Sequence, residues 1–528
     1  MSSAEEAKGR SRYSRRGFLV RAGVGAGAVA VGGGVTGALA PPVLGAPARS
    51  RFVSTDAQHF GRLFPKLPPF APANKGVTKN LLALGAQGGP LDAKDPLGAG
   101  PIALITNPAL SANNPDNPTH TAGTTFMGQF IDHDITFDTG STLGSPTDPL
   151  TSPNGRTPSL DLDSMYGSGP VGSPALYDPT DKAKLLIGSG GIFEDLPRMA
   201  DGTAIVGDPR NDENMIISGL HCAFIRFHNR AAGEASGTWQ ERFAAARRLT
   251  TWHYHWLVLH EFLPLFVGQS MVDDVLAHGR RYYTVGPGQA FMPVEFQGAC
   301  YRFGHSMVRP SYRANLKGDR GQPFFGFVFD PGQNDVTPDP SDLRGIGCHA
   351  PRRFIGWQTF FDFGDGEVKR NKRIDTHIST PLFTLPLGTI ASHDQPTVLP
   401  QRNLLRQLTW SMPSGQAVAA AMGAPVLGKN DLAELKDYEL DKSAPLWYYA
   451  LKEAAVMEDG LHLGPVAGRI VAEVLIGLLG SDPSSYVVQQ PGWTPTLQNP
   501  GAGFRMIDLL TYAGVDPATR HAQQPSYA

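Results

Sequence analysis

Cysteine is scarce in this chain of 528 residues, which contains only Cys222, Cys300 and Cys348. Three cysteines are too few for a disulfide scaffold, and their spacing provides neither a CxxC zinc pair nor a CxxCH motif for covalent cofactor attachment. An excess of charge is also missing, since 46 Lys and Arg residues face 48 Asp and Glu residues. Without a basic field, the chain is not expected to bind nucleic acid or an anionic membrane. The expected partner is a small molecule.

Apolar runs long enough to cross a membrane are also missing after the first 48 residues. The most apolar late segment, Leu463 to Leu479, contains Arg469 and Glu473 and is shorter than the about 20 residues that a span requires. It is therefore predicted to form a buried helix.

The first 48 residues look like a targeting segment. Ser14-Arg15-Arg16-Gly17-Phe18-Leu19 precedes a stretch rich in Ala, Gly and Val, and Ala46-Pro47-Ala48 provides a small-residue cleavage site. This pattern resembles a bacterial twin-arginine export signal. A permanent membrane anchor fits less well because the stretch is rich in glycine. We therefore expect the twin-arginine export machinery to recognise residues 1–48, and the remaining chain to be periplasmic, held in the cell envelope or secreted.

Alternating strand patterns are scarce, and helical periodicity dominates the rest of the chain. Between Ile217 and Ala232 apolar residues recur at steps of three and four, and Thr238 with Glu241 forms a capping-box pattern. Glycine and proline, at 61 and 45 residues, are spread throughout and predict long loops. We predict a mainly α fold with one large domain over 49–528, in which 49–120 is an irregular segment wrapped over the surface. Helices are expected at 217–232, 238–264, 294–310, 400–409, 445–457 and 465–479.

The most informative segment runs from Phe126 to Asp134 and reads Phe-Met-Gly-Gln-Phe-Ile-Asp-His-Asp. It places His133 between Asp132 and Asp134 in otherwise apolar sequence, and buried charged groups need a partner such as a metal ion or a cofactor. The tripeptide alone leaves three interpretations open: a capped helix end, a transition-metal site, and a catalytic base with acidic neighbours.

A second segment is rich in oxygen-bearing side chains. Thr157, Ser159, Asp161 and Asp163 alternate with other residues, which suits a calcium loop that uses hydroxyl, carbonyl and carboxylate oxygens. The alternative is an ordinary Asp-rich turn, unless Asp134 contributes as a distant ligand.

Together with later motifs, these segments resemble the animal-type haem peroxidases of the peroxidase-cyclooxygenase superfamily, in a bacterial member. The resemblance covers about 120–480 of the chain. The distal pattern of the family, Gly-Gln-x-x-Asp-His-Asp, is found at Gly128–Asp134. The other patterns follow in chain order: Asp163-Ser164-Met165-Tyr166-Gly167, Arg210 with Glu213, His228-Asn229-Arg230, Tyr301-Arg302-Phe303-Gly304-His305, and Asn403 with Arg406 and Pro413.

The resemblance implies that haem b is bound with His305 as the iron ligand. Asn403 would accept the hydrogen bond of the His305 ring N–H and fix its tautomer, and Arg302 and Arg406 would also bind the cofactor. Gly304 would let the backbone approach the macrocycle. A lone histidine on an apolar helix is more often a core residue, so this assignment depends on the resemblance.

On the opposite, distal side, the resemblance implies that His133 moves a proton during O–O cleavage of hydrogen peroxide. Arg210 would supply fixed positive charge, and Gln129 would hold water or a halide. Gln129 could also be an ordinary helix-surface glutamine. Asp132 and Glu213 stand where mammalian members form ester bonds to haem, whereas Asn214 replaces the methionine that a sulfonium bond requires.

The resemblance also implies one Ca²⁺ ion in the oxygen-rich loop. Its ligands would be Asp134, Thr157, Ser159 through the backbone carbonyl, Asp161 and Asp163. Because Asp134 follows His133, the ion would hold the distal histidine in place.

Three function classes remain open. A peroxidase would reduce hydrogen peroxide, as in a response to oxidative stress, and oxidise a halide, thiocyanate or an aromatic donor. A fatty-acid dioxygenase of the same superfamily would need a tyrosine three residues before the proximal histidine, where Arg302 stands and Tyr301 is one position too early. The third class is a non-enzymatic matrix or adhesion protein that keeps the fold, and no appended adhesion module supports it.

Overall fold

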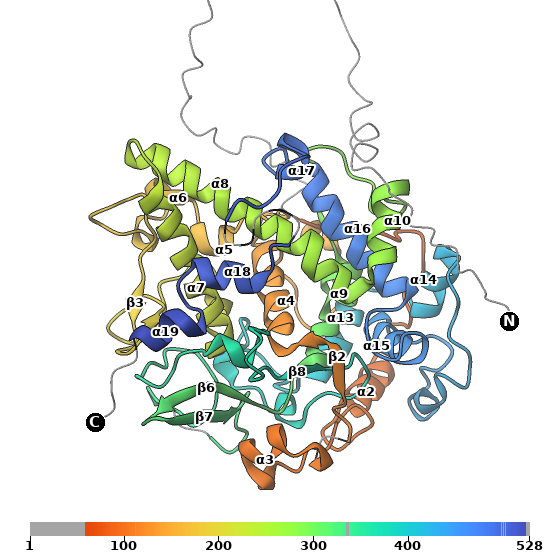
Figure 1. Ribbon diagram of the computed structural model, residues 1–528. Coiled ribbons are helices and arrows are strands. Elements are labelled where there is room, and N and C mark those ends of the chain that lie inside the picture. Colours follow the sequence, from red (N-terminus) through yellow and green to blue (C-terminus); the bar gives the residue numbers. More distant parts are fainter. Residues whose placement is uncertain are drawn as a thin grey trace, which may run out of the picture.

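Helices dominate the computed structural model, which describes residues 59–523 except 111, 334–336, 498, 500 and 502 (Figure 1). The predicted export signal, residues 1–48, lies outside the described residues. The α-helices are α2 (Lys75–Leu84), α3 (Gly100–Thr106), α4 (Ala122–Ile135), α5 (Asp163–Tyr166), α6 (Gly169–Gly172), α7 (Met215–Glu234), α8 (Trp239–Leu257), α9 (Leu263–Val267), α10 (Gln269–His278), α11 (Val294–Gln297), α12 (Gly304–Met307), α13 (Leu399–Thr409), α14 (Gly415–Met422), α15 (Leu446–Met457), α16 (Pro465–Ser481), α17 (Tyr486–Gln489), α18 (Met506–Tyr512) and α19 (Pro517–Gln523).

Strands make up little of the structure and pair only two at a time in the part of the chain described. β1 with β5 is parallel, and the other three pairs are antiparallel. The strands are β1 (Phe60–Gly61), β2 (Asp116–Thr121), β3 (Gly188–Ser189), β4 (Glu194–Asp195), β5 (Met292–Pro293), β6 (Ser311–Asp319), β7 (Gln322–Phe327) and β8 (Arg370–Lys372). The predicted mainly α fold is therefore confirmed.

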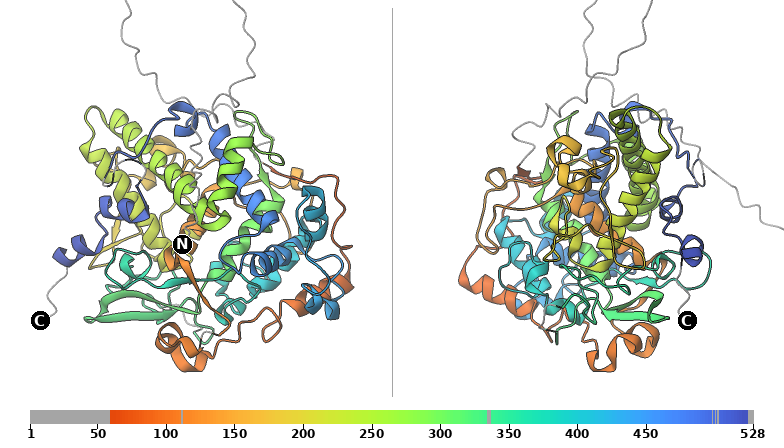
Figure 2. Two further views of the ribbon diagram at one scale, coloured as in Figure 1. Left: turned by 45° about the vertical axis from the view of Figure 1, so that its right-hand side comes forward. Right: turned by 90° about the vertical axis from the view of Figure 1, so that its left-hand side faces the viewer.

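The buried helix α4 occupies the middle of the molecule, and it stays in the interior when the molecule is turned (Figure 2). It contacts α7, α12, β8 and the short turn η6 (Pro209–Asp212). Phe130 of α4 stacks on Phe224 of α7 with 4.6 Å between the ring centroids. At the start of α4, a Cβ on Gly123 would lie 2.4 Å from the ring of Phe361, so only glycine permits this close packing.

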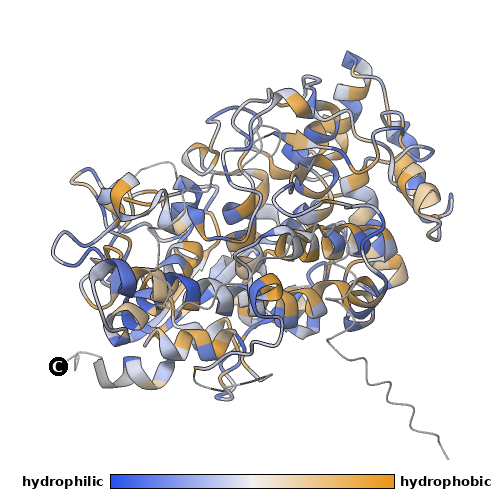
Figure 3. Cartoon of the chain, turned by 90° about the horizontal axis from the view of Figure 1, so that it is seen from above, coloured by the Kyte–Doolittle hydropathy of each residue, from blue (hydrophilic) through white to orange (hydrophobic). Residues whose placement is uncertain are grey.

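The later helices agree with the periodicity of the sequence. α13, α15 and α16 occupy the three ranges expected after residue 400, and α16 is buried on nearly all sides, as its apolar composition predicts. Orange and blue segments alternate along many outer helices in Figure 3, as one buried and one exposed face require. Within the described ranges, no helix is both long and apolar enough to cross a membrane.

The helix expected over 238–264 does not end near Pro264. A π-helical turn, η7 (Val258–Phe262), joins α8 to α9, and Pro264 lies in the first turn of α9. Proline is tolerated in a first helical turn, and the wider π turn before it gives the ring room that a regular α-helix would not provide.

Two further expectations need correction. The single helix expected over 294–310 is divided into α11, the 3₁₀ turn η8 (Cys300–Phe303) and α12. The segment 49–120, expected to be irregular, contains α2, α3 and most of β2 in its described part. Both segments are rich in glycine, alanine or proline, which weakens a periodic signal.

Candidate active site and acidic cluster

Helix α4 and turn η6 bring the predicted distal residues together. Gln129 Nε2 donates to Glu213 Oε2 at 2.9 Å, and His133 Nε2 lies 3.9 Å from the same oxygen. Arg210 Nη1 lies 3.5 Å from Asp132 Oδ2. Two segments separated by about 80 residues of sequence therefore form one wall, on which a base, a cation, an amide and two carboxyl groups are neighbours.

His133 is 4% exposed, and its ring is held through Nδ1, the nitrogen that is not directed toward Glu213. Its Nδ1 lies 2.9 Å from Asn211 Oδ1, and Asn211 Nδ2 lies 2.9 Å from Nδ1 of His221. Burial, and then the positive charge of Arg210, lower the pKa of His133 to about 3. The imidazole is therefore neutral near pH 7.

Arg210 is fixed by Asp208, a fully buried carboxylate. Asp208 accepts from Arg210 Nε at 3.0 Å and from Nη2 at 2.8 Å, and Nη2 also donates to the carbonyl of Thr136 at 2.7 Å. The guanidinium lies over the ring of Phe137, 4.5 Å from its centroid. Burial alone would raise the pKa of Asp208, but Arg210 holds it below its usual value. Arg210 thus stays charged with a fixed orientation.

Asp132 and Glu213 differ from Asp208, because their pKa values are raised and not lowered. Burial raises the pKa of Glu213 to about 8 and also raises the pKa of Asp132. The Glu213 carboxyl group can therefore carry a proton near neutral pH.

The proximal residues meet where α12 packs near α13. The fully buried Asn403 lies with its Nδ2 2.8 Å from Nδ1 of His305. Turning the carboxamide by 180° places Oδ1 at the same position, and an imidazole that binds a metal through Nε2 has its proton on Nδ1 and needs such an acceptor. Burial, and then the charge of Arg302, lower the pKa of His305 to about 3.

Open space lies beside Gly304, the residue that precedes His305. The side chain of His305 and the backbone of Gly304 are partly exposed. A Cβ built on Gly304 would meet no atom within 4 Å. The Tyr301 hydroxyl donates to the carbonyl of Gly128 on α4 at 3.2 Å. The proximal turn and the distal helix are thus joined directly, and the histidine donor set fits a haem iron.

The two predicted cofactor-binding arginines differ. Arg406 forms an ion pair with Asp138 and donates to Ser141 Oγ at 2.6 Å. Arg302 donates to the Gln297 carbonyl at 2.9 Å, and no ion pair of its guanidinium occurs in the part of the chain that is described. Burial, and then Arg406, lower the pKa of Arg302 to about 10, so a buried positive charge remains for an anionic group of a ligand.

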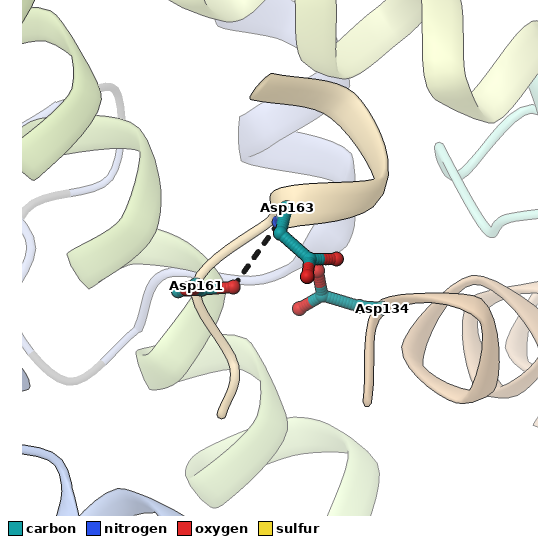
Figure 4. Close-up of side chains that lie close together, drawn as sticks. All are labelled: Asp134, Asp161 and Asp163. Carbon is teal, nitrogen blue, oxygen red and sulfur yellow. Dashed lines mark hydrogen bonds between the residues drawn. The ribbon is translucent and has the colours of Figure 1, made fainter. Parts of the chain in front are cut away.

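Three of the predicted calcium ligands form an acidic cluster (Figure 4). Asp134, Asp161 and Asp163 each offer an oxygen atom, and these atoms lie within 4.8 Å of one another. Neither oxygen of Asp134 makes a hydrogen bond of standard geometry within the described ranges, although the Leu162 amide and the Tyr254 hydroxyl lie beside it. Burial, and then the Asp163 charge, raise the pKa of Asp161 to about 7. Orphaned oxygens and mutual repulsion are what a cation would relieve.

The other two predicted ligands lie in the same loop. The Thr157 amide donates to Asp163 at 3.0 Å, and the Ser159 hydroxyl donates to Asp482 at 3.1 Å. Arg156 connects the loop to the distal wall, because its Nη1 lies 3.2 Å from Asp163 and its Nε lies 2.9 Å from Asp208.

The sequence motifs did not indicate four residues that support the site: Asn211, His221, Asp208 and Arg156. These residues lie near the motif residues in the sequence, but the sequence pattern does not distinguish them from ordinary loop and helix residues. The adjacency of Asn211 to Arg210 was the only available signal.

Comparison with known proteins shows similarity to peroxidases over part of the chain. The sequence profile described as animal haem peroxidase matches residues 139–324. Peroxidase mlt-7 of Caenorhabditis elegans is 33% identical over 129 residues, which cover 23% of this chain and 17% of that protein. Thyroid peroxidase of Mus musculus is 26% identical over 235 residues, covering 37% of this chain and 24% of that protein. The chain thus spans under a quarter of these curated relatives.

Peroxidase A from Dictyostelium discoideum has a similar fold. The two superpose with a TM-score of 0.54 and 17% sequence identity, over 71% of this chain and 82% of that one. Over residues 139–324 the sequence is therefore similar to the animal haem peroxidases, and the fold is similar to that of peroxidase A.

Proposed function

We propose that this chain is a haem peroxidase that reduces hydrogen peroxide and oxidises a small donor such as a halide, thiocyanate or an aromatic compound. The observation that supports it most directly is that α4, which carries His133, contacts α12, which carries His305. Arg210 lies beside His133, and Asn403 lies beside His305. A peroxidase needs one protein ligand below the iron and an open polar pocket above it.

The chain would hold haem mainly from the proximal side. His305 would bind the iron through Nε2, while Asn403 would fix the ring through Nδ1. Arg302 is suited to an anionic edge of the cofactor because its charge has no carboxylate partner among the described residues. When bound, haem supplies the iron that exchanges electrons with peroxide and donor.

The distal residues then move protons and stabilise charge. His133 Nε2 accepts a proton from hydrogen peroxide and returns it to the oxygen that leaves as water. Arg210, held by Asp208, stabilises negative charge that develops on this oxygen. Gln129, directed toward Glu213, is placed to bind a water molecule or a halide beside His133.

The carboxyl groups of Asp132 and Glu213 lie beside Arg210 and His133 and are our candidates for ester bonds to haem. Asn214 cannot form a sulfonium bond. Its side chain instead caps α7 through the amides of Ile216 and Ile217. A sulfonium bond is therefore not proposed.

The environment of Tyr301 argues against the dioxygenase alternative. Its hydroxyl donates to the Gly128 carbonyl, and its ring stacks on Phe296 at 4.5 Å. Arg302 occupies the position where the dioxygenases would need their tyrosine.

Absorption spectroscopy of the purified protein tests the proposed function. We expect a histidine–haem spectrum that changes on addition of hydrogen peroxide and recovers when a halide, thiocyanate or phenol is added. A protein that binds haem but shows no peroxide-dependent change would contradict the activity. Export by the twin-arginine route, with delivery to the periplasm or medium, is part of the same proposal.

We also propose that the acidic cluster binds one Ca²⁺ ion, with Thr157 and Ser159 adding oxygen ligands. Three carboxylates balance a divalent cation, and the buried oxygens of Asp134 lack other strong partners. Because Asp134 directly follows His133, the ion would anchor the end of α4 that carries the distal histidine.

Asp161→Ala is expected to lose most of its calcium and part of its peroxidase rate, since removing one carboxylate weakens the charge balance. Metal analysis should find one calcium per chain in the parent protein and less in the variant, with a lower melting temperature. Asp148→Ala, at an exposed aspartate of the preceding loop, serves as control and should retain the ion. A fully active parent without calcium would disprove this site.

A further inference from the structure

Three buried residues form a continuous hydrogen-bonded series behind the distal wall. His133 is 4% exposed, Asn211 0% and His221 2%. The side chain of Asn211 lies between the two rings, at 2.9 Å from the Nδ1 atom of each. Asn211 belongs to η6, directly after Arg210, and its backbone amide donates to the Asp208 carbonyl at 3.1 Å. One turn thus carries both the distal cation and the partner of the distal histidine.

The two ends of the amide have different hydrogen-bonding abilities. Oδ1 can only accept, so a bond to His133 Nδ1 requires the proton of the neutral ring to be on Nδ1. Nε2, which borders the distal space near Glu213, then presents a lone pair. Nδ2 can only donate, so it requires an unprotonated Nδ1 on His221.

A reversed amide would have the opposite consequence. With Nδ2 toward His133, the ring proton would sit on Nε2, and this nitrogen could not accept a proton from a ligand. A His221 ring with its proton on Nε2 would disfavour that reversal, because its Nδ1 could then only accept. The direction of the amide therefore decides whether His133 is a base.

We infer that Asn211 and His221 are positioning residues that hold His133 in the tautomer able to accept a proton at Nε2. This inference rests on the proposed function, which it deepens. Asn211 determines the tautomer, and His221 determines the direction of the Asn211 amide. Buried amides are often hydrogen-bonded for stability alone, so the test must separate proton transfer from packing.

Two small haem ligands make that separation. Hydrogen cyanide must give up its proton to a base when it binds ferric haem, whereas carbon monoxide binds ferrous haem without any proton transfer. Stopped-flow association rates of both ligands should be measured on the holoprotein of the parent and of three variants: Asn211→Leu, Asn211→Asp and His221→Phe.

Asn211→Leu is expected to slow cyanide association about tenfold, the effect of one lost neutral hydrogen bond, and to leave carbon monoxide association unchanged. Asn211→Asp should slow cyanide association less than Asn211→Leu, because its carboxylate still accepts from His133 Nδ1 although it cannot donate to His221. His221→Phe should give an intermediate cyanide rate, because the amide can then turn.

Unchanged cyanide association in Asn211→Leu would overturn the inference, and so would equal slowing of both ligands, which indicates a packing effect. If Asn211→Leu does not fold, a parental cyanide rate in His221→Phe overturns it instead. A parent protein that binds neither haem nor carbon monoxide would refute the proposed function itself, which is a distinguishable result.

Discussion

His305→Ala is expected to be purified without the haem absorption band. Among the described residues, the histidine that contacts Asn403 is His305, and Gly304 beside it borders open space, so its removal would leave the iron without a protein ligand there. The measurement is the ratio of haem absorbance to protein absorbance after purification in the presence of added haem.

Two controls accompany this variant. His278→Ala, at a surface histidine of α10, should keep the parental ratio. Added imidazole should partly restore haem binding to His305→Ala, because it can occupy the space of the lost ring. A normal histidine–haem spectrum in His305→Ala without imidazole would show that another residue is the ligand.

His133→Ala and Arg210→Ala should each slow the first spectral change after mixing with hydrogen peroxide by about 100-fold or more. The first variant removes the proton acceptor, and the second removes the fixed charge that Asp208 orients. Both variants should bind haem normally, since His305 and Asn403 are untouched.

Stopped-flow absorbance at equal haem content measures this effect. Arg210→Lys provides a matched control, because it keeps the charge but cannot form both contacts with Asp208 in the same geometry, and an intermediate rate is expected. Rates equal to that of the parent in His133→Ala or Arg210→Ala would remove the assigned role.

The sequence predicted the regular helices well because their apolar spacing is local information. α7, α13, α15 and α16 agree with the expected ranges to within about two residues, the usual uncertainty of helix ends. It predicted less where tertiary packing decides: Pro264 does not end its helix, and the chain around His305 forms three short turns in place of one helix.

In the candidate site, too, some residues could be predicted from local sequence and others could not. His133, Arg210 and His305 could be named in advance because they lie in the motifs that carry the resemblance to the animal-type haem peroxidases. Asn211, Asp208 and His221 could not, since their importance arises from contacts between α4, η6 and α7 that form only on folding.

Arg156 has a consequence for attempts to re-engineer this protein. It contacts Asp163 in the acidic loop and Asp208, which in turn orients Arg210. Loop residues are the usual place to vary an enzyme without disturbing its chemistry. Here a library that randomises 156–163 would also change the support of the distal arginine, so diversity aimed at donor preference belongs elsewhere on the chain.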